Sequence, residues 1–158
     1  MEATAGELSD YERERGKPLP SLSHGIVQAN IGFELKTRYG AQFRYLSEIS
    51  IQVADWVMVP DIGIFPTMAT DMQHDEIVLT QMPLTTVEII SGSQAPNELI
   101  NRAHVYLGAG VKSCWVVLPK MGSVAVYSAP GMCKIYYYGQ TLTDPATGIE
   151  LPLGPLFE

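Results

Sequence analysis

Residues 84–118 have the sequence LTTVEIISGSQAPNELINRAHVYLGAGVKSCWVVL, in which two apolar runs flank a helical segment. The first run, residues 85–91, is rich in β-branched side chains and predicts a central strand. Residues 97–107 place apolar side chains on one face and are followed by glycines, which predicts a helix. Residues 112–118 predict the next strand. Together they form a βαβ unit with parallel strands and a right-handed crossover.

Upstream of this unit, the sequence predicts one long helix and then strands. Ser21 or Ser23 caps a helix over residues 24–39, which ends at a glycine. From residue 42 the apolar side chains recur every second position, which predicts a strand over residues 42–53 with one wetter face. A second strand region over residues 56–65 pairs antiparallel with it because the connection is short. Residues 66–83 predict a loop.

The two ends of the chain flank this core. Residues 1–20 contain two prolines and no sustained period, so they predict an arm or a short helix around residues 10–15. Residues 124–128 and 134–138 predict a hairpin, and residues 148–157 pack back on the core. The predicted organisation is therefore an N-terminal arm, residues 1–20, and a single domain, residues 21–158.

Composition limits the class of protein. The chain has 158 residues, which is the size of one domain. Its apolar runs are far shorter than the roughly 20 residues that span a bilayer, and its polar N-terminus lacks the apolar core of a secretory signal. We therefore expect a cytoplasmic protein with no membrane partner. Its two cysteines lack metal-ligand spacing, and neither a phosphate-binding glycine motif nor a serine-hydrolase motif occurs.

The charge balance bears on nucleic-acid binding. The chain has 10 Lys and Arg against 17 Asp and Glu, so its net charge is −7 and its isoelectric point is about 4.9. Nonspecific affinity for DNA comes mainly from Lys and Arg that neutralise phosphates. A DNA-binding surface on this chain must therefore be local, be assembled across an oligomer, or rely on a divalent metal.

Two carboxylates interrupt apolar strand patterns, Asp61 in VPDIGI and Glu88 in TVEII. A buried carboxylate is costly unless it is paired or binds a cation. Each acid alone can also be explained as a strand-end or solvated residue, but two acids on consecutive inner strands favour a shared site. Carboxylate oxygens suit Mg²⁺, which commonly takes one or two protein carboxylates and keeps several waters. We predict a metal site at Asp61 and Glu88.

Other polar residues are weaker candidates. Glu48 lies on the predicted preceding strand and is a candidate third carboxylate, although a solvated strand residue is the favoured interpretation. Arg102 on the second helix either points toward the strand ends or is an ordinary surface residue. His24, His74 and His104 form no recognisable ligand set, and each is predicted to be a cap, loop or helix-surface residue.

Short motifs occur in a fixed order over roughly residues 11–157. They are SLSHG before the first helix, PDIGIFP, TTVEIISGS, YLGAGVKSCWVVLP after the second helix begins, and TDPATGIELPL. Together they resemble the Uma-two family of endonucleases, within the PD-(D/E)XK superfamily. The resemblance implies an α/β fold of the restriction-endonuclease-like class, with a mixed central sheet flanked by helices.

The resemblance also implies a metal-dependent nuclease in which Asp61 and Glu88 bind Mg²⁺ or Mn²⁺. The metal polarises the scissile phosphate and lowers the pKa of an attacking water. The lysine that orients this water in the superfamily corresponds, by the resemblance, to Arg102 in this chain. Arginine keeps the positive charge and can brace a phosphate, but with a pKa above about 12 it does not readily give up a proton.

Two functions follow from these residues. The first is a nuclease that hydrolyses DNA phosphodiester bonds, with catalytic roles for Asp61, Glu88 and Arg102 and assistance from Glu48. The alternative is a catalytically weak or inactive nuclease-like protein that serves as a binding or regulatory module. The two carboxylates favour the enzyme, whereas Arg102 and the acidic surface favour the module. A homodimer is compatible with either function. Nucleases of this fold often act as dimers, because two cuts need two sites.

Overall fold

A computed structural model describes residues 8–92 and 94–158. Its centre is a mixed six-stranded sheet in the order β1-β4-β6-β7-β8-β9. The pair β6–β7 is parallel, and the other neighbours are antiparallel. The strands are β1 (Phe43–Ser47), β4 (Ile62–Pro66), β6 (Thr85–Ile89), β7 (Ser113–Leu118), β8 (Ser123–Ala129) and β9 (Met132–Tyr137). The predicted α/β class with a mixed central sheet is confirmed.

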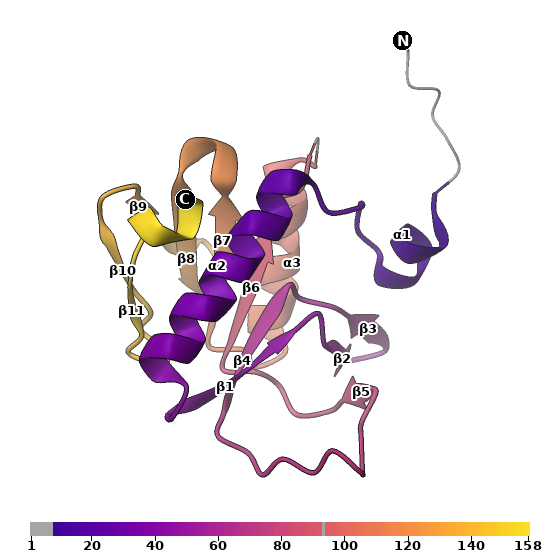
Figure 1. Ribbon diagram of the computed structural model, residues 1–158. Helices are drawn as coiled ribbons and strands as arrows, with labels where there is room; N and C mark the ends of the chain where they lie inside the picture. Colours follow the sequence, from indigo (N-terminus) through magenta and orange to yellow (C-terminus); the bar gives the residue numbers. More distant parts are fainter. Residues whose placement is uncertain (1–7, 93) are drawn as a thin grey trace.

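The two long helices lie on opposite faces of this sheet (Figure 1). They are α2 (Leu22–Tyr39) and α3 (Pro96–Gly108). Because successive side chains of a strand point to opposite faces, Val87 and Ile89 join the apolar cluster under α2. Glu88, between them, points toward α3. A second apolar cluster fills the space between the sheet and α3.

The two long helices begin and end within two residues of the predicted bounds, 24–39 and 97–107. The Ser21 side chain accepts a hydrogen bond from the backbone N–H of His24, and Gly40 ends α2. The helix α3 begins at a proline, which lacks the backbone N–H that would be unpaired there. Gly110 follows α3 with φ of 104°, a conformation that favours glycine. The predicted strand, helix and parallel strand over residues 84–118 are confirmed.

The strands before β6 differ from the prediction. The predicted single strand over residues 42–53 is divided at Glu48, whose φ is 52°, into β1 and β2 (Ser50–Val53). The strand β1 pairs with β4, whereas β2 joins a small sheet with β3 (Trp56–Met58) and β5 (Val78–Leu79). The second predicted strand region, residues 56–65, forms β3 and β4 on either side of Pro60, where the prediction also placed an interruption, because proline cannot donate to a strand ladder.

The C-terminal segment packs against the core, as predicted. It contains β10 (Thr141–Thr143), β11 (Glu150–Pro152) and the short helix η2 (Gly154–Phe157), and Leu151, Leu153 and Leu156 are buried. A second short helix, η1 (Pro119–Met121), joins β7 to β8, and β8 and β9 form the predicted hairpin.

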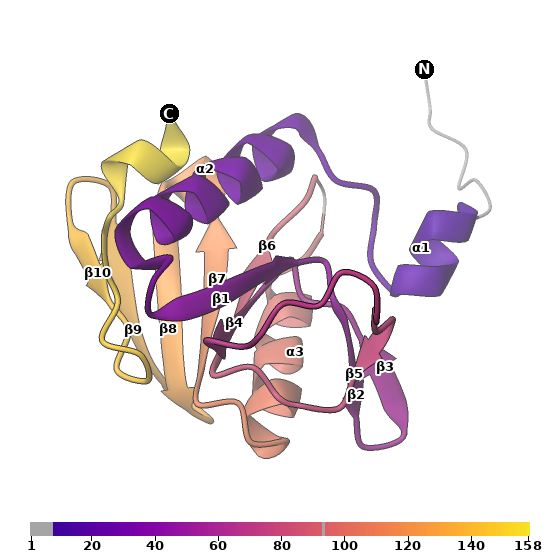
Figure 2. The same cartoon turned by 60° about the horizontal axis from the view of Figure 1, so that its bottom comes forward.

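The first described residues contain the predicted short helix, α1 (Asp10–Arg15). It begins with a capping box between Ser9 and Glu12 and ends at Gly16, whose φ is 66°. None of its residues is buried. Figures 1 and 2 show α1 beside the body of the protein, joined to α2 by an extended segment. The division into an arm and one domain stays a prediction. In the described part of the chain, no helix is long and apolar enough to cross a membrane.

Candidate functional site

Asp61 and Glu88 lie side by side at one end of the sheet. The register between β4 and β6 pairs Ile62 with Val87, so the next residues along, Asp61 and Glu88, face each other. Asp61 Oδ2 accepts a hydrogen bond of 2.7 Å from the backbone N–H of Ile89. Both acids are buried, with 1% and 3% of their surfaces exposed. The structure therefore brings together the two carboxylates that the sequence singled out.

Asp61 is neutralised by basic side chains. Its Oδ1 lies 2.7 Å from Lys17 Nζ and 3.1 Å from His24 Nε2. Gln28 donates a hydrogen bond of 3.1 Å to its backbone carbonyl. Burial raises the pKa of Asp61, but the hydrogen bond from His24 and the charge of Lys17 together outweigh burial and hold this pKa below its usual value. Asp61 is thus a fixed, ionised carboxylate.

Glu88 is held mainly by α3. Its Oε1 accepts hydrogen bonds from Arg102 Nη2 at 2.9 Å, Arg102 Nε at 3.1 Å and the Tyr106 hydroxyl at 3.0 Å. Its Oε2 lies 3.9 Å from Lys17 Nζ. Burial raises the pKa of Glu88 above its usual value, although the charges of Arg102 and Lys17 act in the opposite direction. Arg102 therefore points toward the strand ends, which is one of the two placements that the sequence left open.

Lys17 is the site residue that the sequence did not reveal. Its side chain is only 8% exposed, and its ammonium contacts both carboxylates. Gly16 ends α1 in the left-handed conformation, and Pro18 and Pro20 keep the following chain extended, which carries Lys17 into the site. The only local signal is a Gly-Lys-Pro segment. No periodicity links this segment to Asp61, which lies 44 residues away.

The segment that carries Lys17 closes the site. The remaining cavity has a volume of about 10 Å³, and it is lined by Tyr11, Lys17, Pro18, Pro20, His24, Asp61, Glu88, Ile89, Ser91 and Gln94. That volume accommodates about one water molecule. Ser91 holds the segment in place, because its hydroxyl donates to the Leu19 carbonyl and accepts from the Ser21 N–H, both at 2.8 Å.

Comparison with known protein families identifies the family of this chain. Residues 5–154 match the model of the Uma2 family, which is described as "Putative restriction endonuclease". The chain belongs to the Uma2 family. The resemblance drawn from the sequence motifs is confirmed, and family membership supports a nuclease-like function. No curated protein matches the chain.

A solved structure shows the same fold. It is a crystal structure of a protein from Anabaena variabilis, described as a putative nuclease belonging to DUF820. The two superpose with a TM-score of 0.77 and 20% sequence identity, over 89% of this chain and 83% of that chain. At this identity the likeness establishes the fold of the Uma2 chain. The predicted homodimer and the cytoplasmic location stay predictions.

His24 has a different place from the predicted one. It is buried, because the cap at Ser21 sets it in the first turn of α2, and its Nε2 faces Asp61. Its Nδ1 is buried and has no hydrogen-bond partner among the described residues. The prediction of a cap, loop or surface residue was therefore wrong for His24. It was confirmed for His74, which lies in an exposed loop beside Asp71.

Glu48 lies beside the carboxylate pair but does not join it. It occupies the turn after β1, and not the predicted strand, because its backbone is left-handed there. Its side chain accepts a hydrogen bond of 3.2 Å from the Tyr11 hydroxyl and lies 3.5 Å from Arg15. Its backbone N–H donates to the Asp61 carbonyl at 2.9 Å. Glu48 thus connects the N-terminal segment to the turn beside the site.

The carboxylate pair fits a cation. The Lys17 ammonium occupies a position that Asp61 Oδ1 and Glu88 Oε2 share, so the two acids already converge on one positive charge. Across residues 8–92 and 94–158, no three His, Cys, Asp or Glu side chains are grouped as metal ligands. A metal at this place would have two protein carboxylates and would complete its shell with water, an arrangement that Mg²⁺ commonly adopts.

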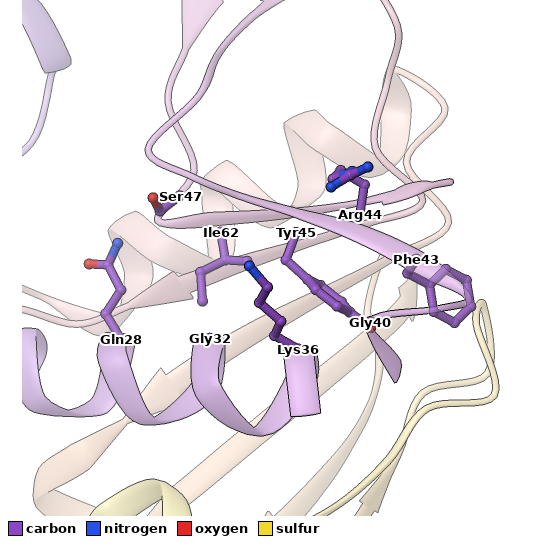
Figure 3. A pocket seen from close by; sticks show the side chains of 9 residues that line it. All are labelled: Gln28, Gly32, Lys36, Gly40, Phe43, Arg44, Tyr45, Ser47 and Ile62. Carbon is purple, nitrogen blue, oxygen red and sulfur yellow. The ribbon is translucent and has the colours of Figure 1, made fainter. Parts of the chain in front are cut away.

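A second cavity, of about 200 Å³, adjoins the site between α2 and β1 (Figure 3). Gln28, which contacts the Asp61 carbonyl, lines it together with Ile62. In Figure 3 the side chains of Gln28 and Lys36 rise from α2 toward β1, and Tyr45 extends from β1 toward the helix. This cavity provides an open, partly cationic surface next to the closed carboxylate pair.

Proposed function

We propose that this Uma2 protein is a metal-dependent nuclease that hydrolyses DNA phosphodiester bonds at Asp61 and Glu88. One observation carries the proposal: two buried carboxylates on neighbouring strands converge on a single cation. Two neighbouring buried carboxylates repel each other when both are ionised, unless a positive charge lies between them. Membership of the Uma2 family supports the same function.

Two of the chain's own residues, Asp61 and Glu88, would hold Mg²⁺ or Mn²⁺. When bound, the metal supplies a Lewis acid and lowers the pKa of a water molecule. The Ile89 N–H and His24 fix the orientation of Asp61, and Arg102 and Tyr106 fix that of Glu88. Hydrogen bonds of this kind keep ligand oxygens in place and commonly tune a metal site.

The acidic character of the chain does not extend to the site. The charges of Asp61 and Glu88 are balanced by those of Lys17 and Arg102. Lys36 adds a positive charge in the adjoining cavity (Figure 3). A DNA strand that enters along α2 and β1 would therefore meet local positive charge, although the net charge of the chain is −7.

A nuclease-like binding or regulatory module is the second candidate function. The observation that favours it is the closed state of the site. Arg102 is locked onto Glu88, and the N-terminal segment leaves a cavity of only about 10 Å³ above the carboxylates. In that function Lys17 and Arg102 would neutralise the two acids permanently.

Metal titration combined with a cleavage assay separates the two functions. Mg²⁺ and Mn²⁺ are titrated by calorimetry into the wild type and into an Asp61→Ala, Glu88→Ala double variant, and each sample is assayed on single-stranded and double-stranded DNA. The matched control is an Asp75→Ala, Glu76→Ala variant, which removes the same charge from an exposed loop.

The proposed nuclease predicts that the wild type and the loop control bind metal and cleave DNA, and that the site variant does neither. Metal binding without cleavage by the wild type would favour the module. A wild type that binds no metal would exclude metal-dependent hydrolysis at this pair.

A further inference from the structure

We propose that Lys17 is the side chain that contacts the substrate phosphate, and that Arg102 only positions Glu88. This inference rests on the proposed nuclease function and assigns a role within its site. It reverses the role that the sequence motifs suggested for Arg102. The reason lies in the partners of the two basic side chains: the Arg102 guanidinium is fixed by several acceptors, whereas the Lys17 ammonium makes one contact of hydrogen-bond length.

Arg102 is held from several directions. Its Nε and Nη2 donate to Glu88 Oε1, and Nη2 also lies 3.1 Å from the Val59 carbonyl and 3.2 Å from the Tyr106 hydroxyl. Its guanidinium lies 5.8 Å from the centre of the Tyr106 ring. Moving Arg102 toward a substrate would leave the buried Glu88 carboxylate without its main partner, which is strongly unfavourable. Arg102 is therefore suited to position Glu88.

Lys17 contacts the two carboxylates and has donor capacity to spare. An ammonium has three N–H donors, and only the contact to Asp61, at 2.7 Å, is of hydrogen-bond length. The Lys17 side chain is long and unbranched, so a small rotation redirects its charge. When the carboxylates are neutralised by another cation, Lys17 can turn its donors to a phosphate oxygen beside them.

The segment that carries Lys17 can shift without opening the core. No residue of α1 is buried. Apart from the charge of Lys17, which a bound cation would replace, the attachments of the segment around the site are polar hydrogen bonds. They join Ser91 to the backbone of Leu19 and Ser21, and Glu48 to Tyr11 and Arg15. Water can replace hydrogen bonds of this kind at modest net cost. The closed cavity therefore requires only a movement of the segment, not of the sheet, to admit a phosphate.

Lys17 acts through charge and hydrogen bonds alone. In the hydrolysis, a water oxygen bonds to phosphorus and the ester P–O bond breaks. The bonding electrons stay on the leaving oxygen, which takes up a proton, and the remaining proton of the water goes to solvent. Lys17 keeps its proton throughout and stabilises the negative charge on the phosphate oxygens in the transition state.

The test compares Lys17→Met with Lys112→Met, which removes an exposed lysine far along the chain. For each protein, kcat and KM for DNA cleavage and the affinity for Mg²⁺ are measured. We expect Lys17→Met to lower kcat about 100-fold, as for the loss of one charge-stabilising donor, and to raise KM, because the contact to the phosphate of the bound DNA is also lost. We expect its affinity for Mg²⁺ to rise, because the competing ammonium is gone. Lys112→Met should resemble the wild type.

A rescue experiment separates this role from a structural one. Lys17→Ala should regain part of its kcat when propylammonium is added, and Arg102→Ala should not regain activity with guanidinium because Glu88 has lost its position. A kcat of Lys17→Met equal to or above that of the wild type would overturn the inference. Lys17 would then only neutralise the two carboxylates and close the site.

Different measurements test the nuclease activity and the role of Lys17. Absence of cleavage by the wild type would contradict the nuclease. Binding of duplex DNA in Ca²⁺ then decides the role of Lys17: weaker binding by Lys17→Met than by Lys112→Met supports the phosphate contact, and equal binding overturns it.

Discussion

Two buried acid clusters lie toward opposite ends of β6, and their partners differ in kind. At the start of the strand, Asp144 is fully buried and accepts hydrogen bonds from Ser113 at 2.6 Å, Thr147 at 2.7 Å and Thr85 at 2.8 Å. All of these donors are neutral hydroxyls. Near its end, Asp61 and Glu88 are held by the charged groups of Lys17 and Arg102.

The difference shows that a buried carboxylate can be satisfied by neutral donors alone or can depend on charged partners. The hydroxyls around Asp144 come from β6, β7 and the turn before β11, so this acid joins three segments. The backbone N–H of Ala146 is a fourth donor at 3.2 Å, so the acceptor sites of the carboxylate are filled. The pair at the other end depends instead on the positive charges of Lys17 and Arg102. The two clusters should therefore respond differently to mutation, metal and pH.

The largest expected effect is on stability at the Asp144 cluster. Asp144→Ala should lower the free energy of unfolding by about 3 kcal/mol, because Thr85, Ser113 and Thr147 lose their shared acceptor inside the core. Chemical denaturation measures the loss, and calorimetry should show Mg²⁺ affinity unchanged. Asp61→Asn should show the reverse pattern, with a smaller loss of stability and no metal binding. A loss below about 1 kcal/mol for Asp144→Ala would contradict the structural role.

The pH dependence of stability should separate the two site acids from each other. The pKa of Asp61 lies below its usual 3.8, so its contribution to stability is present above 3.8 and is lost as pH falls through the lowered value. The pKa of Glu88 lies above its usual 4.5, so its contribution is complete below 4.5 and is lost as pH rises through the raised value.

The measurement is the free energy of unfolding of the wild type, Asp61→Asn and Glu88→Gln against pH, with a chelator present. The advantage of the wild type over Asp61→Asn should shrink on acidification, and its advantage over Glu88→Gln should shrink as pH rises above 4.5. Parallel pH profiles for the two variants would show that the environments of Asp61 and Glu88 do not shift the two pKa values in opposite directions.

The smallest effect should appear where the N-terminal segment meets the site. Ser91→Ala removes the hydroxyl that contacts Leu19 and Ser21, so stability should fall by only about 1 kcal/mol. Trypsin cleavage after Arg15 should become several-fold faster, because the segment leaves the site more often. Ser128→Ala, at an exposed position of β8, is the control. An unchanged cleavage rate would indicate that Ser91 does not hold the segment.

Local sequence determined most of the elements and two of the site residues. Strand and helix periods, the cap at Ser21 and the stop at Gly40 are encoded within a few residues, and the structure confirms them. Asp61 and Glu88 were found because charges are unexpected inside apolar strands. The break at Glu48 was missed, since a left-handed residue within an alternating pattern has little local signal.

The neutralisation of the two acids depends on contacts between distant segments of the chain. The register of β4 against β6 brings Asp61 and Glu88 together, and Lys17 and His24 reach them from segments far earlier in the chain. A buried charge needs an opposite charge nearby in space, and any part of the chain that passes can supply it. Periodicity reports only which face a residue occupies, so it revealed the carboxylates and not the side chains that hold them.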